Sequence, residues 1–141
     1  MKKIQFVLIF ALVACLSCND DSAADVTQIE GYWEIESVQL PNGGGEKDYD
    51  FNNTIDYIEL KDSLSGFRKK LTPQLDGTFL TTDDAEKFVL KIENDSLNVY
   101  YSTSFSSWKE TILFADQERM EVINANKVRY LYKRYEPLNL D

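Results

Sequence analysis

The stretch KFVLKIENDSLNVYY, residues 87–101, decides the fold. In its first half, apolar residues occupy positions 88, 90 and 92, and lysines occupy positions 87 and 91. Asn94-Asp95-Ser96 follows as a turn signal, and positions 97, 99 and 101 are again apolar or aromatic. A period of two on both sides of a turn is typical of neighbouring antiparallel strands that bury one face. The stretch therefore predicts strands, not helices.

The same period recurs on both sides of this stretch. It is found at Trp33–Glu36, Ile55–Leu60, Trp108–Phe114, Met120–Val122 and Val128–Tyr132, with turn signals such as Asp76-Gly77 between the segments. Strands that alternate with turns every 8 to 12 residues or so favour an antiparallel sandwich or barrel. We expect about eight or nine strands in one all-β domain. The one helical turn expected is at Asp83–Glu86, because Thr82 offers a cap there.

Composition and charge exclude several classes of function. The chain has 141 residues, a formal net charge of -9 and no histidine. The absence of histidine removes Ser-His-Asp and Cys-His nucleophiles and His-ligated zinc sites. The negative charge argues against nucleic acid as a partner, since binding it depends on lysine and arginine. No pattern predicts a cofactor, and no pair of carboxylates has a spacing that predicts a catalytic site.

The first residues differ from the remainder of the chain. Lys2 and Lys3 precede an apolar run from Ile4 to Leu16, which is too short for a membrane span of about 20 residues. A basic end followed by a short apolar core is typical of a secretory signal peptide. We expect a leader at residues 1–17, a tether at 18–28, the folded domain at 29–136 and a tail at 137–141.

Both cysteines lie at the end of this leader, a position that resembles the lipidation site of bacterial lipoproteins. Cys18 is the favoured lipidated residue, because Asp20 and Asp21 follow it and resemble the surface-export signal of some Gram-negative lipoproteins. Cys15 is the alternative, because the residues before it fit the cleavage pattern better. The resemblance implies a protein held in the outer membrane of the cell envelope by its lipid, and several acyl chains give a stable anchor.

Gly31-Tyr32-Trp33 resembles the start of the first strand in lipocalin-like proteins. In that family an arginine near the end of the last strand packs on the tryptophan and closes the base of the barrel. Arg134 has the parity of Tyr130 and Tyr132 on the last predicted strand, so we expect it to be the partner of Trp33. The resemblance implies one up-and-down antiparallel barrel across residues 29–136.

The resemblance also implies a function that is not enzymatic. It implies non-covalent binding of a small apolar or amphipathic ligand at the end of the barrel away from Trp33. The candidate lining residues are Tyr57, Tyr101, Tyr130 and Tyr132. The alternative is a barrel filled by its own side chains, which binds a protein or envelope partner through loops such as Pro41–Gly45.

Three further patterns carry weaker hypotheses. Oxygen-bearing side chains spaced nearly as in a calcium loop occur at Asp48, Asp50, Asn52, Asp56 and Glu59, although a solvated acidic loop explains them as well. Asp-Ser-apolar triplets similar to bacterial O-glycosylation acceptors place candidate hydroxyls at Ser22, Ser63 and Ser96. The basic cluster Arg68-Lys69-Lys70 predicts a charged strand face or edge, with anion binding as the alternative.

Overall fold

Residues 24–137 are described by the computed structural model, and ten strands of this part of the chain form one antiparallel sheet. The elements in chain order are the 3-10 helix η1 (Val26–Gln28), β1 (Gly31–Gln39), the 3-10 helix η2 (Pro41–Gly43), β2 (Glu46–Asp48), β3 (Ile55–Asp62), β4 (Ser65–Pro73), β5 (Phe79–Thr81), β6 (Glu86–Glu93), β7 (Ser96–Ser102), β8 (Ser107–Ala115), β9 (Arg119–Asn124) and β10 (Arg129–Arg134). Neither 3-10 helix of the described residues has the length and hydropathy that a membrane-spanning helix requires.

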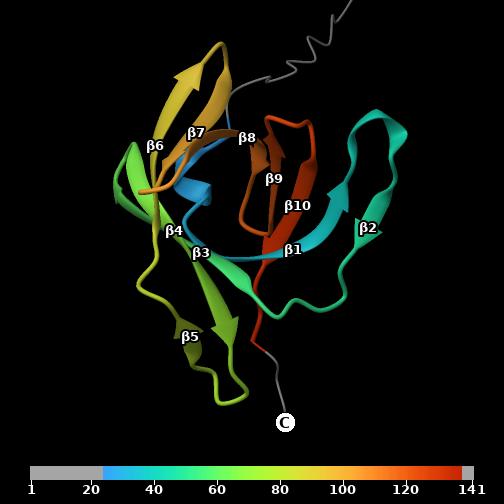
Figure 1. Cartoon of the computed structure of the whole chain (residues 1–141), viewed down its shortest axis with the longest axis vertical. Helices are drawn as coiled ribbons and strands as arrows, with labels where there is room; N and C mark the ends of the chain where they lie inside the picture. The colour runs from blue at the N-terminus through green and yellow to red at the C-terminus, as the bar shows by residue number, and fades with distance from the viewer. Residues whose placement is uncertain (1–23, 138–141) are drawn as a thin grey trace, which may run out of the picture.

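Eight of the strands close into a barrel in the order β1, β3, β4, β6, β7, β8, β9 and β10, because β10 pairs with β1. Figure 1 shows these strands around a common interior. The two remaining strands are short additions: β2 pairs with β1, and β5 pairs with β4. The predicted all-β antiparallel barrel is confirmed.

The prediction of a helical turn at Asp83–Glu86 is wrong. Residues 82–85 form an extended connection with a bend, and Glu86 already begins β6, where it lies opposite Arg68 of β4. The Thr82 hydroxyl does accept a hydrogen bond from the Asp84 amide, 3.3 Å away. This local side-chain bond is compatible with a turn as well as with a helix, so it was a poor indicator of helix.

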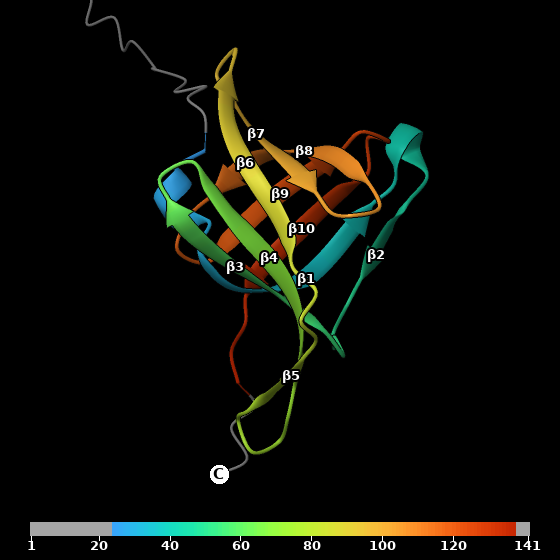
Figure 2. The ribbon, with the colours of Figure 1, turned by 60° about the vertical axis from the view of Figure 1, so that its left-hand side comes forward.

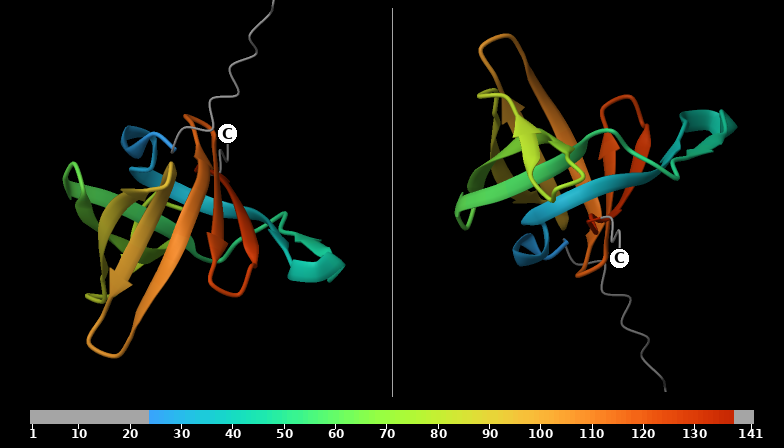
Figure 3. Two further views of the ribbon diagram at one scale, coloured as in Figure 1. Left: turned by 90° about the horizontal axis from the view of Figure 1, so that it is seen from above. Right: turned by 90° about the horizontal axis from the view of Figure 1, so that it is seen from below.

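Strand β1 changes partner along its length. Its first residues, Gly31–Trp33, pair with β3, and its last residues, Ser37–Gln39, pair with β2. Between them, the chain after β2 supplies two hydrogen bonds to β1, from the Tyr49 amide to the Glu36 carbonyl (2.9 Å) and from Asn52 Nδ2 to the Ile35 carbonyl (2.8 Å). The hairpin of β1 and β2 therefore projects away from the barrel (Figure 3).

A register shift in β8 turns the side chain of Phe114 outward, although its alternation with Ile112 predicts that it faces inward. The ladder between β8 and β9 is irregular between Ile112 and Phe114. Ile112 is buried as the alternation predicts, but Phe114 is exposed and Ala115 is buried in its place. An extra residue in one strand moves every later side chain to the opposite face, and this can be seen only once the strands are paired.

The chain before β1 closes one end of the barrel, which we call the base. Ile29 and Trp33 are fully buried there, and Ala24 and Val26 pack against the same core. Figure 2 shows η1, in blue, at this end. The last residues of the segment expected to be a tether thus pack on the barrel, because their apolar side chains cover its open bottom.

Side chains fill the barrel interior next to the base. The buried apolar core comprises Ile29, Trp33, Ile58, Phe88, Leu90, Leu97, Val99, Tyr101, Ile112, Ala115, Met120, Val122 and Tyr132. Eight strands enclose a space just wide enough for side chains to fill or for one small ligand. In this half of the barrel it is the protein's own side chains that occupy the space.

Candidate functional site: a charged layer at the barrel mouth

The end of the barrel opposite the base is its mouth, and the antiparallel order identifies it. Because β1 starts beside η1, β4 ends at the mouth, while β6 and β8 begin there. Figure 2 shows the loop of residues 103–106, which joins β7 to β8, at the end away from η1. Side chains near these strand ends are the ones that a molecule entering the barrel meets first.

Arg68 of β4 extends into the barrel near the mouth and is only 9% exposed. Its Nε lies 2.5 Å from Glu86 Oε2 on β6, and its Nη1 lies 3.3 Å from Glu110 Oε2 on β8. Its guanidinium carbon also lies 4.3 Å from the ring centroid of Tyr101 on β7. One arginine therefore joins three other strands of the barrel through two ion pairs and a cation–π contact.

These neighbours determine the charge state of the interior. Burial alone would lower the pKa of Arg68, but Tyr101, Glu110, Glu86 and Asp56 raise it above its ordinary value. The guanidinium therefore remains charged. Burial also raises the pKa of Tyr101 and that of Tyr132, so both phenols stay neutral at physiological pH.

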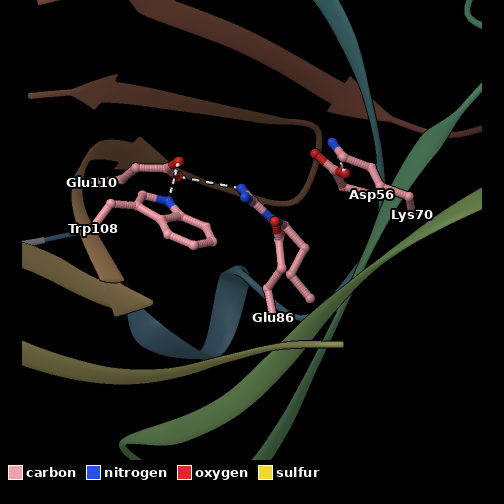
Figure 4. A network of polar contacts seen from close by, with 6 residues as sticks. Asp56, Lys70, Glu86, Trp108 and Glu110 are labelled. Atoms are coloured by element: carbon pink, nitrogen blue, oxygen red, sulfur yellow. Dashed lines mark hydrogen bonds and ion pairs between the residues drawn. The ribbon is translucent and has the colours of Figure 1, made fainter. Parts of the chain in front are cut away.

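Trp108 of β8 adds an aromatic surface to this group. Its ring stacks on Tyr101, with centroids 5.0 Å apart and an interplanar angle of 13°. Its Nε1 donates a hydrogen bond to Glu110 Oε1, 3.2 Å away. Figure 4 shows the Glu110 carboxylate beside the indole nitrogen of Trp108. Arg68, Tyr101 and Trp108 thus form a continuous stack that Glu110 holds from one side.

A second ion pair joins Lys70 of β4 to Asp56 of β3, which lie opposite one another in the ladder. Figure 4 shows the two side chains next to each other. Asp56 is 3% exposed, whereas the Lys70 side chain is largely exposed. We call the five ionised residues the charged layer: Asp56, Arg68, Lys70, Glu86 and Glu110. With three carboxylates and two cations, the layer has a net charge of -1.

The cluster Arg68-Lys69-Lys70, predicted to form a charged strand face or edge, does not lie on one face of β4. Strand alternation directs Arg68 and Lys70 to the inward side, where Arg68 is buried and the largely exposed Lys70 pairs with Asp56. Only Lys69 lies on the outer face, with its Nζ 6.0 Å from the Phe67 ring centroid. Strand β4 pairs with β3 on one side; on the other side it pairs with β6 up to Arg68 and with β5 from Leu71, so within the described residues only the short stretch Lys69-Lys70 lies between these two ladders.

A hollow of about 620 Å³ lies at the rim of the mouth, beside the charged layer. Glu86 belongs to both, since it lines this hollow and pairs with Arg68. Phe105, which is 98% exposed, also lines the hollow, from the loop between β7 and β8. The full lining is Asp84, Ala85, Glu86, Lys87, Ser102, Thr103, Ser104 and Phe105. The hollow thus combines two carboxylates, one lysine, several hydroxyls and an apolar ring.

Of the four tyrosines predicted to line a pocket, three lie on the inner side of the barrel and one lies on its outer wall. Tyr101 and Tyr132 are buried inside the barrel, and Tyr130 is half-buried beside Tyr132, with ring centroids 6.5 Å apart. The prediction that Tyr57 lines a pocket is wrong, because Tyr57 lies on the same face of β3 as Glu59 and points outward. It packs against Tyr32 on the barrel's outer wall, with centroids 4.7 Å apart.

The outward position of Tyr57 gives a prediction about alkaline stability. Burial, and then its hydrogen bond to Glu59, raise the pKa of Tyr57 to about 12. An unfolded tyrosine loses its proton near pH 10. Between these values the unfolded chain binds fewer protons than the folded chain, so the free energy of unfolding falls as the pH rises.

We expect Tyr57→Phe to remove this contribution. Its stability should decline less steeply than that of the unmodified protein between pH 10 and pH 12, and the two should show equal slopes below pH 10. Urea denaturation at closely spaced pH values measures this difference. Equal slopes above pH 10 would contradict the prediction.

At the base, the structure brings together the three residues that the resemblance singled out. The Arg134 guanidinium carbon lies 3.7 Å from the Trp33 ring centroid, and Trp33 Nε1 donates to the Ile29 carbonyl, 2.8 Å away. Arg134 also donates to the Glu30 and Gln28 carbonyls, at 2.6 Å each. Gly31 has a φ of +124°, and a Cβ there would lie 2.5 Å from Arg134 Nη1. A glycine is therefore required where the chain crosses the arginine.

The residues proposed for calcium are not gathered around a common centre. Asp48 ends β2, Asn52 donates to the β1 backbone, and Glu59 lies on the outer face of β3 with Lys61. Asp56 points instead into the barrel. Asp50 is exposed in the connection between β2 and β3. Within residues 24–137, the structure shows no group of three or more acidic, cysteine or histidine residues able to hold a metal ion.

The proposed modification sites lie partly outside the described residues. Cys15, Cys18 and Ser22 all precede residue 24. Ser63 is exposed in the turn between β3 and β4, and Ser96 is half-buried at the start of β7. Asp62 caps that first turn by accepting hydrogen bonds from the Leu64 amide and the Ser65 hydroxyl. The Asp-Ser pattern at 62–63 thus has a structural role as well.

The sequence did contain a signal for the charged layer. On each of three strands, a charged residue lies two positions from an apolar or small residue that faces the interior. The pairs are Asp56 with Ile58, Arg68 with Gly66, and Glu110 with Ile112. An ionised residue on the inward face of a strand is expensive to bury unless an opposite charge meets it. That three strands carry such residues with opposite signs indicates an interior network, although the pairing itself cannot be derived from the alternation.

Comparison with known proteins identifies the family. A search of curated proteins and a search of solved structures each found no match to the chain. A family model described as a lipocalin-like domain matches residues 29–122, from Ile29 at the base of the barrel to the middle of β9. Barrels of this family are typically binding proteins. Because the match spans well over half of the chain and the strands close as such a barrel does, this chain belongs to the lipocalin-like domain family.

Proposed function

We propose that this protein binds a small amphipathic ligand non-covalently at the mouth of its barrel. The observation that carries the proposal is the contrast between the two ends. The base is filled by packed apolar side chains, whereas the mouth presents ionised groups next to Trp108, Tyr130 and the rim hollow. Ligand sites commonly combine apolar surface with a few convergent polar groups, and the mouth of a barrel is a frequent position for them.

The filled base supports a ligand that is amphipathic and shallow. Leu90 and Leu97 are 1% and 0% exposed, so a long apolar chain has no space beneath the charged layer. An apolar part of the ligand would instead contact aromatic side chains near the rim, such as Phe105. Its polar part would contact the accessible oxygen of Glu86, which a purely apolar ligand would cut off from water.

The proposal places the protein at the envelope, with lipid on Cys18 or Cys15. Ala24 packs against the core at the base of the barrel. An anchor that precedes Ala24 by a few residues would thus attach the domain by its base and leave the mouth directed away from the membrane. Such an orientation suits a receptor for molecules in the aqueous phase better than a carrier that extracts lipids from the same bilayer.

A groove outside the barrel supports a second candidate function, an interaction module. It measures about 720 Å³ and lies between the hairpin of β1 and β2 and the turn that joins β9 to β10. Leu40, Pro41, Ile123, Lys127 and Arg129 are among its lining residues. A protein partner could contact this groove without entering the barrel, and the mouth would then have no ligand.

Native mass spectrometry of the protein extracted from its own membrane tests the proposal. We expect a mass increment for a lipid on one cysteine and a retained small molecule, together with uptake of the neutral dye Nile red that amphipathic competitors reverse. The Cys18→Ala and Cys15→Ala variants identify the lipidated residue. A protein that carries no small molecule and takes up no dye would overturn the binding function and favour the interaction module.

A further inference from the structure

We infer that the polar end of the ligand is cationic, a protonated amine on a small apolar body, and not a carboxylate or phosphate. This inference rests on the proposed function, because it concerns the ligand of the same mouth. Three features of the charged layer and the rim hollow support it: the cations of the layer are already paired, a carboxylate remains accessible, and an apolar ring lines the same hollow.

Both cations of the layer are already neutralised by the protein. Arg68 donates to Glu86 and Glu110, and Lys70 pairs with Asp56. An anionic ligand could reach the buried guanidinium of Arg68 only by displacing Glu86 or Glu110. The displaced group would then be a buried charge without a partner, and breaking a buried pair is strongly unfavourable. An anion entering the mouth would in addition meet a layer whose net charge is already negative.

A carboxylate of the layer remains accessible from the rim. The side chain of Glu86 is 31% exposed, and Arg68 occupies only its Oε2. Within residues 24–137, the structure gives Glu86 Oε1 no hydrogen-bond donor. An ionised carboxylate accepts several hydrogen bonds, and an ammonium group carries donors only, so the two are complementary. Asp84 lines the same hollow and provides a second carboxylate, so the carboxylates of the hollow outnumber its one lysine, Lys87.

The apolar lining of the hollow favours an apolar part in the ligand. Phe105, which is almost wholly exposed, and Ala85 belong to this lining. An aromatic side chain attracts a cation near its face and also packs against an alkyl chain. The net charge of -9 attracts cations to the whole surface, and the hollow adds carboxylates and an aromatic ring at the mouth of the barrel.

Three probes with the same tail test the inference: dodecylamine, dodecanol and dodecanoate. We expect dodecylamine to displace Nile red from the full chain at pH 7 with an apparent Kd at least tenfold lower than that of dodecanoate, at concentrations below micelle formation. Dodecanol should fall between them, because it has the tail without the charge. Isothermal titration calorimetry of the same probes provides a readout that is independent of the dye.

Two matched variants separate the mouth from the general field of the protein. Glu86→Gln removes the accessible carboxylate, and Glu121→Gln removes a carboxylate of nearly equal exposure (31% and 32%) that pairs with Arg129 on the outer wall. Both change the net charge by the same amount. We expect Glu86→Gln to reduce the preference for dodecylamine over dodecanoate at least fivefold, and Glu121→Gln to leave it unchanged.

The outcomes distinguish this inference from the proposed function. If all three probes bind equally, or if dodecanoate binds best, the cationic ligand is wrong and the binding function stands. If both glutamine variants reduce the preference to the same extent, the general field explains it and the mouth has no part. If no probe binds at all, the proposed function and the inference fail together.

Discussion

Replacing Arg68 by methionine is expected to destabilise the protein by about 3–5 kcal/mol, because the substitution leaves two carboxylates inside the barrel without a cation. Glu86 and Glu110 both depend on this arginine, and the guanidinium also covers the ring of Tyr101. Methionine has a similar length and can fill most of the vacated space, so the loss reports the uncompensated charge more than a cavity. Urea denaturation followed by circular dichroism measures the change in the free energy of unfolding.

Two further variants make this prediction specific. In the triple variant Arg68→Met, Glu86→Gln, Glu110→Gln, the unpaired carboxylates are gone, and most of the lost stability should return. Arg129→Met removes an arginine that pairs with Glu121 on the outer wall, where exposed ion pairs contribute only about 0–1 kcal/mol. Equal losses in Arg68→Met and Arg129→Met would show that the charged layer does not behave as a buried network.

The cost of the charged layer bears on its role. A buried ionic network is weak evidence for stability, since apolar residues of the same volume often do as well or better. The base of this barrel is packed by such residues, so apolar side chains can fill the interior of this fold. Charges used in their place where a ligand would enter are more simply explained by binding than by stability. A stable, ligand-free triple variant would agree with this explanation.

The strand pattern allowed the barrel to be predicted, because period two is a local property of the chain. Phe88, Leu90, Leu97 and Val99 face the core as their alternation indicates. Phe114 does not, because the register shift in β8 depends on pairing with β9 and has no local signature. The prediction for Tyr57 failed for a related reason. An aromatic residue suits either face of a strand, and only the position of Tyr57 on the same face as Glu59 indicates that it points outward.

The candidate site was harder to predict than the fold. Arg68, Glu86 and Glu110 lie on three different strands, and the sequence separation between Arg68 and Glu110 is 42 residues. Which charges meet across a barrel depends on its tilt and closure, which no single segment encodes. The rim hollow likewise arises from the connection before β6 and the loop after β7 together. Long-range geometry, and not local propensity, creates both.

The base offers the second large effect: Trp33→Ala is expected to cost about 3–5 kcal/mol of stability, as other tryptophan truncations in cores do. Trp33 is 0% exposed, so its removal opens a cavity between η1 and the barrel floor. It also leaves the Ile29 carbonyl without the indole donor and takes away the ring beneath Arg134. Thermal and urea denaturation followed by circular dichroism measure the loss, with Phe105→Ala as an exposed aromatic control that should change stability by less than about 0.5 kcal/mol.

A double-mutant cycle separates the packing of Trp33 from its contact with Arg134. Arg134→Met alone removes the cation from the indole face together with the bonds to the Glu30 and Gln28 carbonyls. If the cation–π contact contributes, the double variant should lose about 0.5–2 kcal/mol less stability than the sum of the losses in the two single variants. Losses that add fully would mean that the indole acts only as an apolar plug. Either way, a small loss in Trp33→Ala would contradict the assignment of this end as the sealed base, and with it the argument that ligands reach the barrel only from the mouth.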